Sequence, residues 1–192
     1  MKLISCNIID NQVKINDELI YSSKEHLIES FLKELYYKFE IKYPKFFKMD
    51  NLCKIGIIGT ELIHRKSKSI LNQKNKIGII LQNRSSSLDS DLKHQEGIDN
   101  NDVSPAVFVY TLPNIVIGEI SIKQNWQSEG VFFIDNQIDC ELLSQYSNIL
   151  LKEKRTVINL VGWIDVLKNK SSLKLCLIDR QITTEDLESL MH

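Results

Sequence analysis

The stretch Ser104-Pro105-Ala106-Val107-Phe108-Val109-Tyr110-Thr111-Leu112-Pro113-Asn114, followed by Gly118-Glu119-Ile120, says most about the fold of this chain. Pro113 suits the first turn of a helix, where the missing backbone N–H leaves no bond unmade. The side chain of Asn114 can bond local backbone groups that such a turn leaves unpaired. We therefore expect Tyr110 to Asn114 to act through structure, and a direct role in substrate binding is the alternative.

Two segments on the N-terminal side of this stretch differ sharply in character. Residues 76–81 read Lys-Ile-Gly-Ile-Ile-Leu, a continuous apolar run typical of a strand buried on both faces. Residues 84–102 are rich in Ser, Asp and Asn, which predicts a long surface loop with a helical turn around Leu88 and Leu92. The serines at 85–87 lack the glycine context of a nucleophile or phosphate loop, so we expect them to be solvated.

Residues 51–63 admit two interpretations. Their isoleucines favour a strand by propensity, whereas the spacing of the apolar residues places them on one face of a helix. Asp50 can cap such a helix, and Gly56 and Gly59 would let it approach a neighbour closely. We predict the helix.

Hydrophobic periodicity predicts the remaining elements. They are a strand, turn and second strand at 3–20, a helix at 27–40 with a capping box at 22–25, a strand at 131–134, a helix at 141–153, and strands at 156–163 and 173–178. The inward residues of the later helix would be Leu142, Tyr146, Ile149 and Leu150. This alternation predicts the α/β class, with one domain over residues 1–192 and a mainly parallel or mixed sheet covered by helices.

Composition and charge exclude several functions. Hydrophobic residues make up 43% of the chain and charged residues 26%, as in ordinary globular proteins, and no apolar run approaches the ~20 residues of a membrane span. A net charge of -1 gives no electrostatic footprint for nucleic acid. The cysteines are widely separated and have no histidine at metal-ligand spacing. We therefore expect no metal or cofactor, and reduced thiols in a cytoplasmic protein.

The order of these segments resembles the N-terminal half of β-ketoacyl synthases over residues 45–165. Residues 48–54 are similar to the start of an early helix in that family, and the strand at 77–81 runs into a serine-containing turn. The motif Tyr110-Thr111-Leu112-Pro113-Asn114, with Gly118 and Glu119, is similar to another family segment, and residues 160–165 resemble the strand after the nucleophile helix. This resemblance implies one of the two thiolase-like halves of a complete synthase.

The resemblance also implies where a nucleophile would stand. The family places a cysteine at a helix N-terminus, where the helix dipole favours the thiolate. Gly130 begins the matching segment here. An ungapped count from Gly130 reaches Asp139, with Cys140 one residue beyond it. If the strand is taken as two residues shorter, Gln137 falls at the position instead. A glutamine there would resemble the chain-length-factor partners of polyketide ketosynthases. The structural alternatives are an inert cysteine at a helix start and a polar turn residue, and the acidic neighbours of Cys140 would raise a thiol pKa.

The histidines do not complete a condensing site. The family uses two, in a half that this chain does not contain, and the only histidine after Cys140 is His192. His26, His64 and His94 match no catalytic motif. We therefore expect a ketosynthase-like protein of fatty-acid or polyketide synthesis without independent condensing activity.

The resemblance implies partners as well. Residues 131–134 would pair across a dimer axis, in a homodimer or in a heterodimer with a full-length ketosynthase, and acyl carrier protein is a further candidate partner. One alternative function is acyl-thioester transfer or hydrolysis by Cys140 with groups supplied by the partner. A second is a non-catalytic module that binds an acyl chain or a carrier protein.

Overall fold

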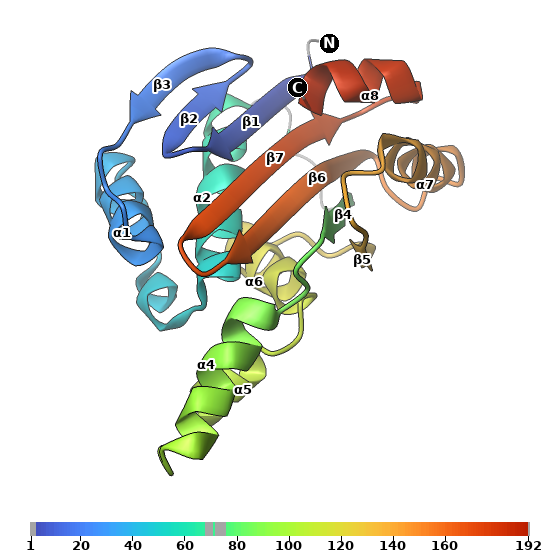
Figure 1. Ribbon diagram of the computed structural model, residues 1–192. Helices are drawn as coiled ribbons and strands as arrows, with labels where there is room; N and C mark the ends of the chain where they lie inside the picture. The colour runs from blue at the N-terminus through green and yellow to red at the C-terminus, as the bar shows by residue number, and fades with distance from the viewer. Residues whose placement is uncertain (1–2, 68–70, 72–75, 192) are drawn as a thin grey trace.

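The computed structural model describes residues 3–67, 71 and 76–191, and within them one sheet has the strand order β3-β2-β1-β7-β6-β4-β5 (Figure 1). The strands are β1 (Ile4–Ile9), β2 (Gln12–Ile15), β3 (Glu18–Ser22), β4 (Ile77–Asn83), β5 (Gly130–Ile134), β6 (Ile158–Leu167) and β7 (Lys170–Ile178). The helices are α1 (Ile28–Lys38), the 3-10 helix η1 (Pro44–Lys48), α2 (Asn51–Lys66), α4 (Leu88–Asp99), α5 (Pro105–Val109), α6 (Ile115–Gln124), α7 (Cys140–Lys152) and α8 (Thr184–Met191). None of these helices is long and apolar enough to cross a membrane.

The sheet is mixed, one of the two arrangements expected from the sequence. β4 pairs in parallel with β5 and β6, as crossover connections require. β7 follows β6 through a short hairpin and therefore runs antiparallel to it, and β1 pairs antiparallel with β7. The parallel part of the α/β pattern is thus confined to three strands.

Two tight turns shape the N-terminal edge of the sheet. Ile9 pairs with Gln12, and the two residues between them, Asp10 and Asn11, have φ of 48° and 59°. Positive φ at both central residues is typical of the hairpin turns that fit the twist of the flanking strands. A second turn of this kind at residues 16 and 17 leads into β3, so the predicted strand, turn and second strand become a three-stranded meander.

One face of the sheet packs against α2, which also contacts α1 and α6. The predicted helix at 51–63 is confirmed, and the Asp50 carboxylate caps it by accepting a hydrogen bond from the Cys53 N–H at 2.9 Å. A Cβ on Gly56 would lie 2.6 Å from Val116 Cγ2 of α6, and one on Gly59 would lie 2.8 Å from Leu173 of β7. Both glycines therefore permit close approach, as expected.

The opposite face is covered by α7 and α8 (Figure 1). The predicted inward face of α7 was partly wrong, because Ile149 is 49% exposed while Leu143 and Ser147 are buried. Buried Asn159 of β6 donates hydrogen bonds to the Ser147 carbonyl at 3.1 Å and hydroxyl at 2.9 Å. This polar contact holds Ser147 on the buried face of α7, whereas hydrophobic periodicity predicted Ile149 there.

The expected loop at residues 84–102 was also wrong, because 88–99 form the helix α4. Asp89 in its first turn accepts a hydrogen bond from the Lys168 N–H at 2.9 Å and forms an ion pair with Lys93 at 3.2 Å. The capping box predicted at 22–25 is absent too: α1 begins after Leu27, without a side-chain cap. The Ser23 hydroxyl instead donates to Glu34 of α1.

Candidate functional site

The N-terminus of α7 is where the sequence places a nucleophile. The helix begins at Cys140, directly after Asp139, whose carboxylate accepts a hydrogen bond from the Leu142 N–H at 2.9 Å. This is ordinary N-capping by an aspartate, which places a negative charge at the positive end of the helix. An added anion at this end of the helix would face that charge.

Gln82 of β4 occupies the other side of this helix start. Its Oε1 accepts a hydrogen bond from the Asp139 N–H at 2.9 Å, and the residue is fully buried. An oxyanion hole needs backbone N–H groups that are free to receive the developing charge. Here one N–H points to Gln82 and another to the Asp139 carboxylate, so the chain's own side chains occupy two of the donors.

Cys140 has the surroundings of a core residue. It is 7% exposed and packs with Ile80, Val161 and Cys176 among others. Burial raises the pKa of its thiol, the charges of Glu188 and Asp139 raise it further, and Lys174 opposes them. A reactive cysteine needs an electropositive, partly exposed site, so the geometry favours a thiol over a thiolate.

Gln137 lies in the exposed segment that joins β5 to α7. The segment begins where the Asp135 N–H donates to the Asn83 carbonyl at 2.9 Å, at the end of β4. Gln137 and Cys140, the two positions that the sequence alignment left open, thus lie on either side of the helix start, one exposed and one buried. The choice between them stays a prediction.

The motif at Tyr110 to Asn114 builds a different cluster. The Tyr110 hydroxyl donates to Glu119 Oε1 at 3.3 Å, and Lys45 Nζ lies 2.7 Å from the same oxygen. Glu119 is 5% exposed, and burial followed by the charge of Glu119 raises the pKa of Tyr110. These contacts join α6 to η1 and to the segment after α5.

The other motif residues have local roles. Thr111 donates from its hydroxyl to the Phe108 carbonyl at 2.8 Å, Leu112 is 58% exposed, and Pro113 lies in the turn before α6. Asn114 is the N-cap of α6 but makes no side-chain capping bond, contrary to expectation. Its backbone is already helical, so the side chain is not presented to the first N–H groups. Gly118 is exposed and has nothing within 4 Å of an added Cβ.

The structure does not bring the two predicted sites together. Tyr110 belongs to the core cluster built on α2, whereas Cys140 belongs to the cluster under α7 and α8. The two clusters lie on opposite faces of the sheet (Figure 1). The motif therefore supports the fold of α6 and does not line the start of α7.

Asp165 is a structural centre that sequence reasoning missed. Its carboxylate accepts hydrogen bonds from the Ser85 N–H at 2.8 Å, the Ser85 hydroxyl at 3.2 Å and the Arg84 N–H at 3.2 Å. The Ser87 hydroxyl donates to the Thr111 carbonyl at 2.8 Å. The serines expected in a solvated loop are thus largely buried, Ser85 at 9% exposure and Ser87 at 6%, because Asp165 and Thr111 bind them.

The described histidines do not assemble a site with Cys140. His64 of α2 bonds to Gln124 of α6, and His94 of α4 lies beside the Phe108 ring with 5.3 Å between centroids. His192 lies outside the described residues. Within residues 3–67, 71 and 76–191, no group of three His, Cys, Asp or Glu side chains is placed to hold a metal ion.

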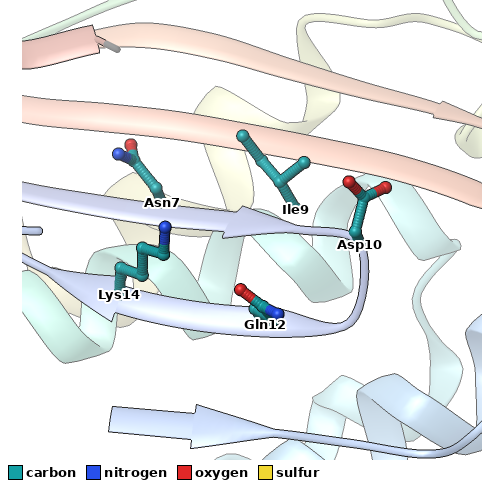
Figure 2. Close-up of a pocket in the computed structure, with 5 residues that line it drawn as sticks. All are labelled: Asn7, Ile9, Asp10, Gln12 and Lys14. Atoms are coloured by element: carbon teal, nitrogen blue, oxygen red, sulfur yellow. The ribbon is translucent and has the colours of Figure 1, made fainter. Parts of the chain in front are cut away.

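A small pocket of about 170 Å³ lies on the β1–β2 hairpin. Its lining residues are Asn7, Ile9, Gln12 and Lys14 along the two strands and Asp10 at the turn (Figure 2). Asn7 pairs with Lys14 on one side and with Lys174 of β7 on the other. The pocket is small and lined mainly by polar side chains, and it therefore offers little to an acyl chain.

The fold can be compared with known proteins. Neither a protein-family model nor a curated protein sequence matches the chain. Among solved structures, the ishigamide ketosynthase/chain length factor matches with a TM-score of 0.69 and 10% identity, covering 92% of this chain and 61% of that one. A type II PKS acyl-carrier protein in complex with its ketosynthase bound to the hexaketide matches with a TM-score of 0.63 and 13% identity, covering 93% and 62%.

A third structure is a ketosynthase in complex with its chain length factor from Xenorhabdus doucetiae. It matches with a TM-score of 0.56 and 8% identity, covering 94% of this chain and 77% of the other. This chain thus spans about three fifths of the first two matched chains and about three quarters of the third. It has the fold of these ketosynthase structures, as the sequence resemblance implied.

Proposed function

We propose that this protein is a cytoplasmic ketosynthase-like subunit that docks on a full-length ketosynthase of fatty-acid or polyketide synthesis and does not condense acyl units itself. The observation that carries the proposal is the exposed side of β5. This strand ends the sheet, pairs with β4 on one side only within the described residues, and bears the half-buried Phe132 and Phe133 and the 52% exposed Ile134. An open apolar strand edge invites pairing with another strand.

A second apolar surface begins near this edge. We call α4, α5 and the residues that join and follow them, 88–112, the arm; it starts five residues after β4 and extends away from the sheet in Figure 1. Its exposed large apolar side chains are Leu88, Leu92, Ile98, Val103, Phe108, Val109 and Leu112. Exposed apolar residues gathered on one segment are typical of a protein–protein contact. The chain enters the arm five residues after β4 ends at Asn83, and Asn83 pairs with Ile134 of β5, which supports an interface that includes both surfaces.

The start of α7 supports the absence of condensing activity. Gln82 and the Asp139 carboxylate engage the helix-start N–H groups, and Cys140 is a buried thiol with a raised pKa. Condensation needs a nucleophile and groups that stabilise the developing enolate. The described histidines lie elsewhere, so a partner would have to supply the chemistry.

The comparisons support a paired subunit. All three matched structures are named as a ketosynthase together with a chain length factor or an acyl-carrier protein. In the structure from Xenorhabdus doucetiae the matched chain is only modestly longer than this one, since 77% of it is covered. We therefore propose a heterodimer with a ketosynthase as the working assembly, and acyl carrier protein as the further partner of that assembly.

The experiment is co-purification with the full-length ketosynthase encoded nearest to this chain, followed by size-exclusion chromatography with light scattering. We expect a one-to-one complex that Ile134→Lys and Phe108→Glu weaken by at least tenfold in Kd. Ile149→Lys, which alters an isoleucine of similar exposure on α7, should leave binding unchanged. A strict monomer that ignores both synthases and acyl carrier protein would overturn the proposal. An acyl adduct that forms on the wild type and is lost in Cys140→Ala would favour the thioester-transfer alternative instead.

A further inference from the structure

A pocket of about 190 Å³ lies where the arm meets the helices that cover the sheet. Its lining comes from α1, from the segment that joins η1 to α2, from the first turn of α2, and from α4 and α5 of the arm. Met49, Ala106 and Val107 give it apolar surface. The volume is below the roughly 300 Å³ at which sites for larger ligands begin, so the pocket admits only a small molecule.

Lys54 of α2 lines this pocket and is partly buried. Within the described residues, its Nζ forms neither an ion pair nor a hydrogen bond. The Glu29 carboxylate would be a partner, but Lys93 Nζ lies 3.4 Å from it and also 3.2 Å from Asp89. Lys93 therefore holds the nearby carboxylates, and Lys54 is left as an amine without a partner beside a second lysine.

The backbone that carries Lys54 is fixed. The Lys54 N–H donates to the Asp50 carbonyl at 3.0 Å, in the first turn of the helix. The Asp50 carboxylate is itself engaged, since it accepts from the Cys53 N–H and from the Ser90 hydroxyl, each at 2.9 Å. The amide oxygen of Asn51, another lining residue, is enclosed in the protein and is not available to a ligand. Among these groups, Lys54 is the one left free to react.

The surroundings of Lys54 favour the neutral amine, the form that acts as a nucleophile. Burial lowers the pKa of Lys54 from its ordinary value of 10.5; the charge of Glu29 opposes this, that of Lys93 adds to it, and that of Asp50 opposes it. The remaining charged residue of the lining is Lys48 of η1, a further cation. A lysine that is partly desolvated beside another cation is the usual arrangement of an amine activated to form an imine.

We infer that Lys54 forms an imine with a small aldehyde or ketone that enters this pocket. The lone pair of Nζ attacks the carbonyl carbon, and the two hydrogens of the neutral amine leave with the carbonyl oxygen as water. A C=N bond thus replaces the C=O bond, and neither an oxidant nor a reductant is consumed. Met49, Ala106 and Val107 would contact a short apolar substituent on the carbonyl carbon. The inference does not depend on docking with a ketosynthase.

The test is reductive trapping of the free protein with propanal and sodium cyanoborohydride at pH 7.5, followed by peptide mapping with mass spectrometry. Cyanoborohydride reduces an imine to a stable secondary amine, which marks the lysine that formed it. We expect Lys54 to be alkylated at least fivefold faster than Lys33, an exposed lysine of α1, with a rate that saturates as the propanal concentration rises. Lys54→Arg should abolish this fast component and leave the trapping at Lys33 unchanged.

Two charge variants should move the reaction in opposite directions, which loss of folding could not do. Lys93→Met removes the neighbouring cation and releases Glu29, so the midpoint of the pH–rate profile of Lys54 should rise and trapping at pH 7.5 should slow at least threefold. Glu29→Gln removes a carboxylate that stabilises the ammonium, so the midpoint should fall and trapping should accelerate.

Ala106→Leu tests the pocket separately from the charge. The larger side chain occupies part of the space, so the propanal concentration that gives half of the maximal rate at Lys54 should rise at least threefold, with no change at Lys33. Three results would overturn the inference: equal trapping at Lys54 and Lys33, a rate at Lys54 that rises with propanal without saturating, or Lys93→Met and Glu29→Gln shifting the pH–rate profile in the same direction.

Discussion

Gln82 accepts a hydrogen bond from the Asp139 backbone N–H at 2.9 Å, and this single bond ties the end of β4 to the start of α7 across 57 residues of sequence. The bond both fixes the helix start and fills the place where an external acceptor would bind. The same contact therefore contributes to stability and argues against catalysis.

Gln82→Ala should lower the free energy of unfolding by about 1–3 kcal/mol, because it leaves the Asp139 N–H without its acceptor. Urea denaturation measures the change. Gln137→Ala, in the exposed segment before α7, is the control and should change it by less than about 0.5 kcal/mol. Neither variant should form an adduct with acyl-carrier thioesters. An unchanged midpoint for Gln82→Ala would show that the bond does not hold the helix start.

Gly56→Ala should destabilise the protein by about 1–3 kcal/mol, since the new methyl group would meet Val116 Cγ2 at 2.6 Å and Ile164 Cδ1 at 3.0 Å. Gly118→Ala places the same change in α6, where nothing lies within 4 Å. That control should stabilise the helix by about 0.5–1 kcal/mol, because alanine restricts the unfolded chain. Thermal and urea unfolding of the two variants should thus shift in opposite directions.

Iodoacetamide should alkylate Cys140 more than about tenfold more slowly than a free cysteine at pH 7, because burial and acidic neighbours raise the pKa of the thiol. Intact mass measured over time gives the rate, and Cys140→Ala identifies the site. Labelling should accelerate only above pH 9, because the pKa of the Cys140 thiol is raised above the ordinary cysteine pKa of 9.0. Rapid labelling of Cys140 near neutral pH would reveal an activated thiol and favour the transferase alternative.

Glu61 should make stability depend on pH under acidic conditions. Burial alone would raise the pKa of Glu61, but hydrogen bonds and charge from Lys123, with Arg65 and Gln124, outweigh it and lower the pKa from 4.5 to about 2. A carboxyl with a lowered folded-state pKa stabilises the protein fully above about 4.5, and the effect is lost as pH falls toward 2. The contribution, discounted for partial exposure, is about 1–3 kcal/mol.

Urea unfolding of wild type and Glu61→Gln at several pH values checks this. The difference between the two should fall by about half between pH 6 and pH 3, as the lowered pKa requires. A difference that stays constant over this range would mean that Glu61 does not titrate as its contacts imply.

Local signals in the sequence identified part of this fold. The helix at α2 was predictable because Asp50 caps it and its apolar residues keep a helical period, even against the strand propensity of isoleucine. The hairpin turn at Asp10 and Asn11 was predictable from residue types that tolerate positive φ. In both cases a few adjacent residues carry the information.

Long-range contacts supplied what the sequence could not show. α4 was missed because Asp89 stabilises it through Lys168, 79 residues away. The buried face of α7 was predicted wrongly in part because Asn159 donates a hydrogen bond to Ser147, which lies in the core. At the candidate site, sequence placed Cys140 at a helix start but not Gln82 beside it. These contacts depend on tertiary placement, and no periodicity encodes them.

The pairing of β1 with β7 bears on how the polypeptide emerges from the ribosome. Ile4 lies opposite Leu177, so β1 must await the much later strand β7 before its second edge is paired. Contacts of such large sequence separation slow folding and keep nascent chains aggregation-prone. Translation that stops before residue 170 would leave β1 and β6 without the strand between them, so shortened products should be captured by chaperones or degraded rather than accumulate.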